Sequence, residues 1–138
     1  MTVPHTNTWE RYGVVKRFGG LVSADEMAAS VEEIACHPNF RNIRFIIDDM
    51  LEVQDLQLDE ACVERIAISQ LGSRYTNPNI RIAIVTASDA IARMKQMLDV
   101  PRFAGAYETQ VFATVAQARQ WLQSQPILRE APKRFSLR

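Results

Sequence analysis

The stretch Phe45-Ile46-Ile47 and its counterpart Ile82-Ala83-Ile84-Val85 decide the predicted fold. Each is a short run of consecutive apolar residues, bounded by polar or turn-forming residues. Runs of this length and composition are typical of strands that are covered on both faces, as in parallel sheets. We therefore expect the two runs to lie side by side in the interior of one sheet.

Strand and helix patterns alternate along the chain on both sides of these runs. Capping boxes, in which a Ser or Thr and a residue three positions later satisfy free backbone N–H groups, mark two helix starts. They are formed by Ser23 with Glu26 and by Thr114 with Gln117. The expected strands cover residues 11–18, 43–51, 80–86 and 108–112, with helices at 24–36, 58–75, 90–98 and 115–122.

This alternation favours a mostly parallel sheet with right-handed crossovers. We predict an α/β fold with a four- to five-stranded, mostly parallel sheet and about four helices in a single domain. Gly19-Gly20 is predicted to turn the chain after the first strand, which could pair antiparallel at an edge. The domain covers residues 1–123, and residues 124–138 form a basic tail.

The amino-acid composition limits the kinds of molecule that the protein is expected to bind. The 138 residues contain 16 Lys and Arg and 16 Asp and Glu, so the net charge is zero. Nucleic-acid-binding proteins normally have a basic excess, whereas zero net charge favours self-association. No apolar run approaches the ~20 residues of a membrane span, and residues 1–10 do not resemble a signal peptide. We therefore expect a cytoplasmic protein without a membrane span, in which Cys36 and Cys62 are free, buried thiols.

Several local signatures occur in an order that resembles the STAS domains, and more specifically the small uncharacterised SpoIIAA-like proteins. They cover about residues 10–123 and comprise residues 20–26 (GLVSADE), 37–40 (HPNF), 82–85 (IAIV), Val111-Phe112 and the pattern Ala118-x-x-Trp121-Leu122. The resemblance implies a SpoIIAA-like fold and a domain that acts by binding partner proteins. STAS domains are switched by phosphorylation of a Ser or Thr just after the second apolar strand. Residues 31–68 contain no Ser, Thr or Tyr, so that switch is chemically impossible here.

Four acidic residues follow the apolar run at 45–47 and form the predicted partner-binding site. They are Asp48, Asp49, Glu52 and Asp55. Open α/β sheets bind ligands at the carboxyl ends of their strands, where we expect these side chains to emerge. The alternative is that they are solvated loop residues or caps of the next helix.

A second hypothesis is a carrier or sensor of a small apolar or lipid-like ligand. Met50, Met94, Met97 and Phe103 would line its pocket, because methionine suits adaptable binding surfaces. Ordinary core packing is the alternative explanation for the same residues, since helical spacing already accounts for Met94.

No convergent set of catalytic residues is visible, and neither a cofactor nor a metal site is predicted. The favoured function is a non-enzymatic regulatory or protein-interaction domain of STAS-like type. Its protein partner is unknown, and the sequence leaves a homodimer as an alternative partner arrangement. An enzyme ranks third.

Overall fold

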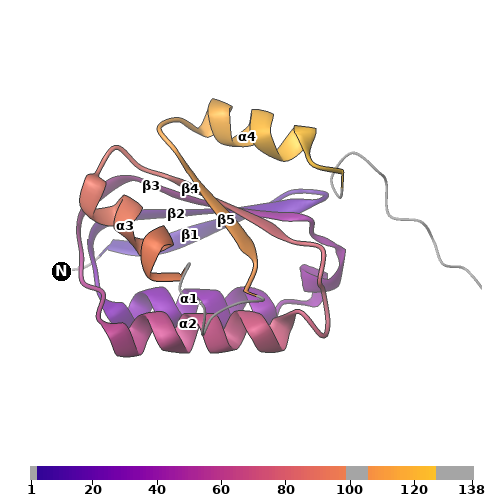
Figure 1. Cartoon of the computed structure of the whole chain (residues 1–138), viewed down its shortest axis with the longest axis horizontal. Helices are drawn as coiled ribbons and strands as arrows, with labels where there is room; N and C mark the ends of the chain where they lie inside the picture. Colours follow the sequence, from indigo (N-terminus) through magenta and orange to yellow (C-terminus); the bar gives the residue numbers. More distant parts are fainter. Residues whose placement is uncertain (1–2, 99–105, 127–138) are drawn as a thin grey trace, which may run out of the picture.

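A single five-stranded sheet, in the order β1-β2-β3-β4-β5, forms the centre of the protein (Figure 1). This computed structural model describes residues 3–98 and 106–126. The strands are β1 Val3–Trp9, β2 Gly13–Val22, β3 Phe45–Leu56, β4 Arg81–Val85 and β5 Glu108–Phe112. The helices are α1 Ala24–Ala35, the 3-10 helix η1 Pro38–Asn42, α2 Glu60–Ser73, α3 Asp89–Leu98 and α4 Val115–Ser124.

Helices cover the two faces of the sheet unequally. Figure 1 shows α1 and α2 side by side beneath the sheet and α4 alone above it. The core on the α1/α2 face includes Phe18, Ile46 and Met50, and the core on the α4 face includes Phe45 and Ile47. Side chains of successive strand residues point to opposite faces, so the apolar run of β3 serves both layers.

The two apolar runs lie side by side, as predicted. Ile46 of β3 pairs with Ile82 of β4, and Ile47 pairs with Ala83. β2, β3, β4 and β5 are mutually parallel, and only β1 runs antiparallel to its neighbour. The prediction of a mostly parallel sheet between helices is therefore confirmed.

The amino-terminal part of the sheet differs from the expectation in two respects. β1 was not predicted, because its sequence has no apolar alternation. Gly19 and Gly20 do not turn the chain but lie within β2, between β1 and β3. Gly20 has a positive φ of 66° beside a bulge, a conformation that glycine adopts without steric cost. β2 is thus an interior strand, and β1 takes the antiparallel edge position.

Both predicted helix caps are present. Ser23 Oγ accepts a hydrogen bond from Glu26 N, and Thr114 Oγ1 accepts one from Gln117 N, each at 3.1 Å. The reciprocal half of the box differs, since the Gln117 side chain accepts from Ala113 N. These caps begin α1 and α4 at the predicted places because capping is decided by neighbouring residues.

Candidate functional site

Asp48 and Asp49 lie inside β3 and not in a loop beyond it. Both are 6% exposed, and they point to opposite faces of the sheet. Each pairs with a basic residue directly across the strand pair, Asp48 with Lys16 and Asp49 with Arg17. The prediction that both acids emerge at the rim is therefore wrong. The strand extends further than the apolar run suggests, and its partner strand supplies the countercharges.

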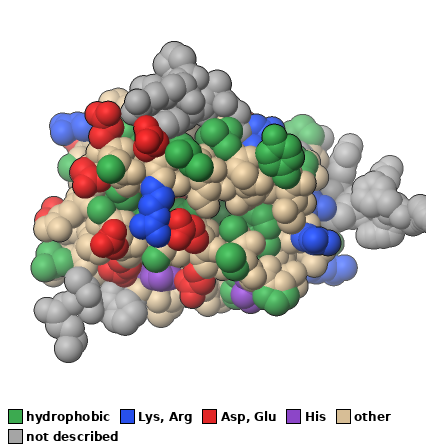
Figure 2. All heavy atoms as spheres, turned by 90° about the horizontal axis from the view of Figure 1, so that it is seen from below, with side chains coloured by type: hydrophobic (Ala, Val, Ile, Leu, Met, Phe, Trp, Pro, Cys, Tyr) green, Lys and Arg blue, Asp and Glu red, His purple; other side chains and the backbone are tan. Residues whose placement is uncertain are grey.

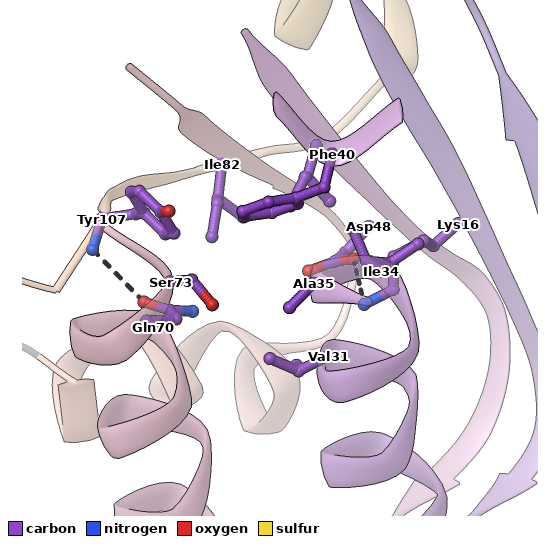
Figure 3. A pocket seen from close by; sticks show the side chains of 11 residues that line it. Lys16, Val31, Ile34, Ala35, Phe40, Asp48, Gln70, Ser73, Ile82 and Tyr107 are labelled. Atoms are coloured by element: carbon purple, nitrogen blue, oxygen red, sulfur yellow. Dashed lines mark hydrogen bonds and ion pairs between the residues drawn. The ribbon is translucent and has the colours of Figure 1, made fainter. Parts of the chain in front are cut away.

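Lys16 and Asp48 form a buried ion pair on the α1/α2 face of the sheet. Lys16 is 2% exposed, and its Nζ lies 3.5 Å from Asp48 Oδ1. Figure 3 shows the pair beside a small cavity, with Gln70 and Tyr107 on the opposite side. Gln70 Oε1 accepts a hydrogen bond from Tyr107 N at 3.3 Å. Burial of two opposite charges costs solvation energy that only their mutual attraction offsets, so each depends on the other.

The cavity beside this pair has a volume of about 30 Å³. A space of this size holds about one water molecule, and its lining combines apolar side chains with the polar groups of Lys16, Asp48 and Gln70. Asp48 Oδ1 forms no hydrogen bond with the described residues, so it could accept one from such a water. The cavity is far too small for a lipid-like molecule.

The residues predicted for an apolar ligand pocket do not form one among the described residues. Met50 is 1% exposed and belongs to the core between the sheet and the helices. Met97 packs against Val63 and Ala67 of α2. Phe103 and the side chain of Met94 lie outside the described residues. The carrier hypothesis therefore receives no support.

β3 continues well beyond the end of its neighbour β4. Val85, the last residue of β4, pairs with Asp49, whereas β3 extends to Leu56. Over residues 50–56, β3 pairs with β2 on one side. On the other side, no strand formed by the described residues pairs with it. Among the residues 3–98 and 106–126, β3 therefore has an open edge in its second half.

A groove of about 290 Å³ follows this open edge. One wall consists of residues 53–56 and Leu58, and the other is formed by Ser88 and the α3 residues Ala90, Ile91, Arg93 and Met97. Four consecutive strand residues point alternately to both faces of the sheet, so a groove that touches all four must run along the strand edge. We call it the β3 groove. It contains two of the predicted site residues, Asp55 of the acidic set and Met97 of the apolar set, while Glu52 is exposed just before it.

Acidic residues gather at the end of the sheet that holds the β3 groove. Helices that follow parallel strands begin at the strands' carboxyl ends, and acids in a first helical turn are stabilised by the helix dipole. Figure 2 shows the acidic side chains of the α1/α2 face in its left half, where both helices begin. The exposed acids at this end are Asp25, Glu52, Asp55, Asp59, Glu60 and Asp89.

Basic residues prevail at the opposite end of the sheet. They lie where strands begin or where a helix has just ended, and include Arg41, Arg44, Arg74 and Arg81. The net charge of zero thus conceals two ends of opposite sign. Composition alone does not reveal this separation.

The two cysteines have different environments. Cys62 is buried, its Sγ donates a hydrogen bond to Ala24 O at 3.2 Å, and burial raises the pKa of its thiol. Cys36 is exposed, which corrects the expectation that both thiols are buried. Within the described residues, no group of His, Cys, Asp and Glu is arranged to hold a metal ion. The same residues include no helix that is long and apolar enough to cross a bilayer.

Sequence reasoning did not predict that Asp55 and Met97 line one groove beside β3. The expected strand ends at residue 51, whereas β3 extends to Leu56, and the alternation of Leu51 and Val53 was an available sign that the strand continues. It also missed a cluster at β1, where His5 Nε2 lies 2.9 Å from Glu33 Oε1 of α1 and Asn7 Nδ2 donates to the same oxygen. These contacts fasten the edge strand to α1.

A solved structure with the same arrangement establishes the class of fold. The anti-sigma factor antagonist SpoIIAA, in its unphosphorylated form, superimposes with a TM-score of 0.58 at 13% sequence identity, over 88% of this chain and 99% of that one. An uncharacterized DUF3478-family protein with a SpoIIAA-like fold from Shewanella loihica PV-4 gives a TM-score of 0.46 at 16% identity, over 86% and 91%. No family model and no curated protein matches the sequence.

This protein therefore has a SpoIIAA-like fold, as the order of its sequence signatures predicts. At this level of identity the likeness concerns the fold. Function has to be argued from the site itself.

Proposed function

We propose that this chain is a non-enzymatic, cytosolic regulatory domain that acts by binding another protein chain at the β3 groove. The observation that carries the proposal is the groove itself, which combines an open strand edge, apolar wall residues and acidic neighbours. Exposed strand edges provide unpaired backbone groups for a binding partner. SpoIIAA, which shares the fold, is an anti-sigma factor antagonist.

The start of α2 supports an interaction that does not depend on phosphorylation. Asp59 caps this helix, and its Oδ1 accepts a hydrogen bond from Cys62 N at 2.7 Å. No hydroxyl side chain occurs in residues 31–68, which include the whole second half of β3 and this cap. Under the proposal, binding is therefore controlled by partner concentration and charge, and not by phosphate transfer to this segment.

Site-specific photo-crosslinking in cells tests the proposal. A photoreactive amino acid replaces Gln54, an exposed residue of the groove wall, in the full chain. We expect one dominant adduct, identified by mass spectrometry, that is absent when the same amino acid replaces the exposed Gln120 of α4. Equal labelling at both positions, or no adduct at Gln54, would contradict the proposal.

Two charge-reversal variants, one at the groove and one control away from it, make this experiment more specific. Glu52→Lys combined with Asp55→Lys should reduce the Gln54 adduct, because both side chains are exposed at the groove. Glu108→Lys reverses an exposed acid at the opposite end of the sheet and should leave the adduct unchanged. If the two variants behave alike, the groove is not the binding site.

A further inference from the structure

We infer that the β3 groove accepts residues 133–138 of a second copy of this chain as an added strand. The inference rests on the proposed binding role of the groove and identifies its occupant. Three features support it: the unpaired edge of β3, the pattern of residues 133–138, and the charges of both partners.

The open edge of β3 provides the backbone part of the site. Leu51 N already donates to Asp49 Oδ1 at 3.1 Å, so the available edge begins after this residue. From Glu52 to Leu56, the side of β3 that faces α3 pairs with no strand in the described part of the chain. An extended peptide placed there would pair with β3 in the position that β4 would occupy if it continued past Val85.

The pattern of residues 133–138 matches the two sides of such a site. The sequence is Lys-Arg-Phe-Ser-Leu-Arg, in which Phe135 and Leu137 alternate with Arg134, Ser136 and Arg138. In an extended conformation, the two apolar side chains share one face and the polar ones the other. The groove provides apolar wall residues, among them Val53, Leu56 and Ile91, and carries Asp55 beside them.

The charges of the two partners are complementary. Residues 127–138 contain Arg129, Lys133, Arg134 and Arg138 against the single acid Glu130. The groove end of the sheet carries the exposed acids Glu52, Asp55, Asp59, Glu60 and Asp89, and Arg93 is the one basic residue among the lining residues of the groove. Complementary charges accelerate and orient association, and salt weakens them when they are exposed. The association should therefore weaken as ionic strength rises.

The position of α4 favours a second copy over the groove of the same chain. Gln125 Oε1, just after α4, accepts a hydrogen bond from Arg81 Nε at the start of β4. The described chain after α4 therefore ends close to the amino end of the strands, whereas the groove lies beyond their carboxyl end. Residues 127–132 span at most about 20 Å when fully extended. To reach the groove of the same chain they would first have to pass the length of β4, which is about 16 Å. Reciprocal exchange between two copies closes a dimer.

Two complementary variants test the inference in the full chain. Glu52→Lys with Asp55→Lys reverses the groove charges, and Arg134→Glu with Arg138→Glu reverses those of the added strand. We expect the unaltered chain to dimerise reversibly in sedimentation experiments and each variant alone to dimerise at least about tenfold more weakly. An equimolar mixture should recover the dimer, because every strand then meets a groove of opposite charge.

Further experiments test the apolar contacts of the added strand and its location in the groove. Phe135→Ser with Leu137→Ser should also weaken the dimer, and a synthetic peptide of residues 127–138 should dissociate it where a scrambled peptide does not. Amide hydrogen exchange of residues 53–56 should slow as the protein concentration rises. Slow exchange at every concentration would place the segment in its own groove and overturn the second-copy assignment.

A chain that stays monomeric at all concentrations, or a variant mixture that does not recover the dimer, also overturns the inference. The crosslinking experiment distinguishes this failure from a failure of the proposed function. If Gln54 crosslinks to a different protein while the chain stays monomeric, the groove is a binding site but its occupant is not a second copy.

Discussion

The two halves of β3 have the same kind of residues in opposite environments. Residues 45–50 are buried with helices on both faces, and residues 45–49 have strands on both sides. Residues 51–56 are half-buried or exposed, and Leu51 is 48% exposed. The acids of the covered half pair with Lys16 and Arg17, whereas Glu52 and Asp55 face solvent. A carboxylate in this strand thus contributes to stability or to binding according to what covers it.

The comparison predicts its largest effect at the buried ion pair. Asp48→Asn should lower the free energy of unfolding by about 3–5 kcal/mol, because it leaves the Lys16 ammonium buried without a countercharge. Lys16→Met combined with Asp48→Leu should recover most of this loss, since no charge remains to be desolvated. Urea denaturation of the three proteins measures both effects. A single variant as stable as the unaltered chain would show that the pair is solvated.

Close packing in the covered half is tested by Gly13→Ala. A Cβ at Gly13 would overlap the ring of Phe45, so the substitution should cost about 1–3 kcal/mol. Gly72→Ala in α2 is the matched control, because nothing lies within 4 Å of its Cβ position. That change should stabilise the helix by about 0.5–1 kcal/mol. Thermal unfolding that places both variants on the same side of the unaltered chain would contradict this account.

The alkaline limit of stability should depend on Tyr107. Its hydroxyl donates to Asn77 O at 2.6 Å, and burial raises its pKa to about 12. The unfolded chain has a tyrosine pKa of about 10, so the folded state retains this proton longer. The resulting stabilisation is complete below about pH 10 and is lost between about pH 10 and 12.

Tyr107→Phe tests this dependence directly. The variant should be about 1–2 kcal/mol less stable near neutral pH, because it leaves a buried carbonyl without its donor. The difference from the unaltered chain should shrink as pH rises from about 10 to 12, because the variant has no proton to lose there. A constant difference across this range would mean that the hydroxyl does not titrate as described.

The smallest effect on stability is expected in the open half of β3. Glu52→Lys with Asp55→Lys should change the free energy of unfolding by less than about 0.5 kcal/mol, because both side chains are exposed. The same variant should nevertheless weaken binding at the groove. A loss of several kcal/mol would show that this half is as tightly packed as the other, and the contrast between the halves would disappear.

Local sequence signals predicted most of the fold correctly. The capping residues Ser23 and Thr114 and the apolar runs act over a few neighbouring residues, so their patterns are visible without tertiary contacts. β1 was missed because its side chains are fastened by a distant helix, through Glu33. Gly19-Gly20 was assigned to a turn because local propensity cannot reveal that strands pair on both sides of it.

The sequence alone determined the order of strands and helices from β2 onward, the adjacency of the two apolar runs and the absence of a hydroxyl switch in residues 31–68. The tertiary structure decided which acids are buried, where β3 becomes an open edge and how the charges separate between the two ends. The physical reason is the distance along the chain over which each interaction acts. Periodicity and capping are local, whereas burial and strand register depend on residues that are far apart in the chain and meet only when the sheet forms.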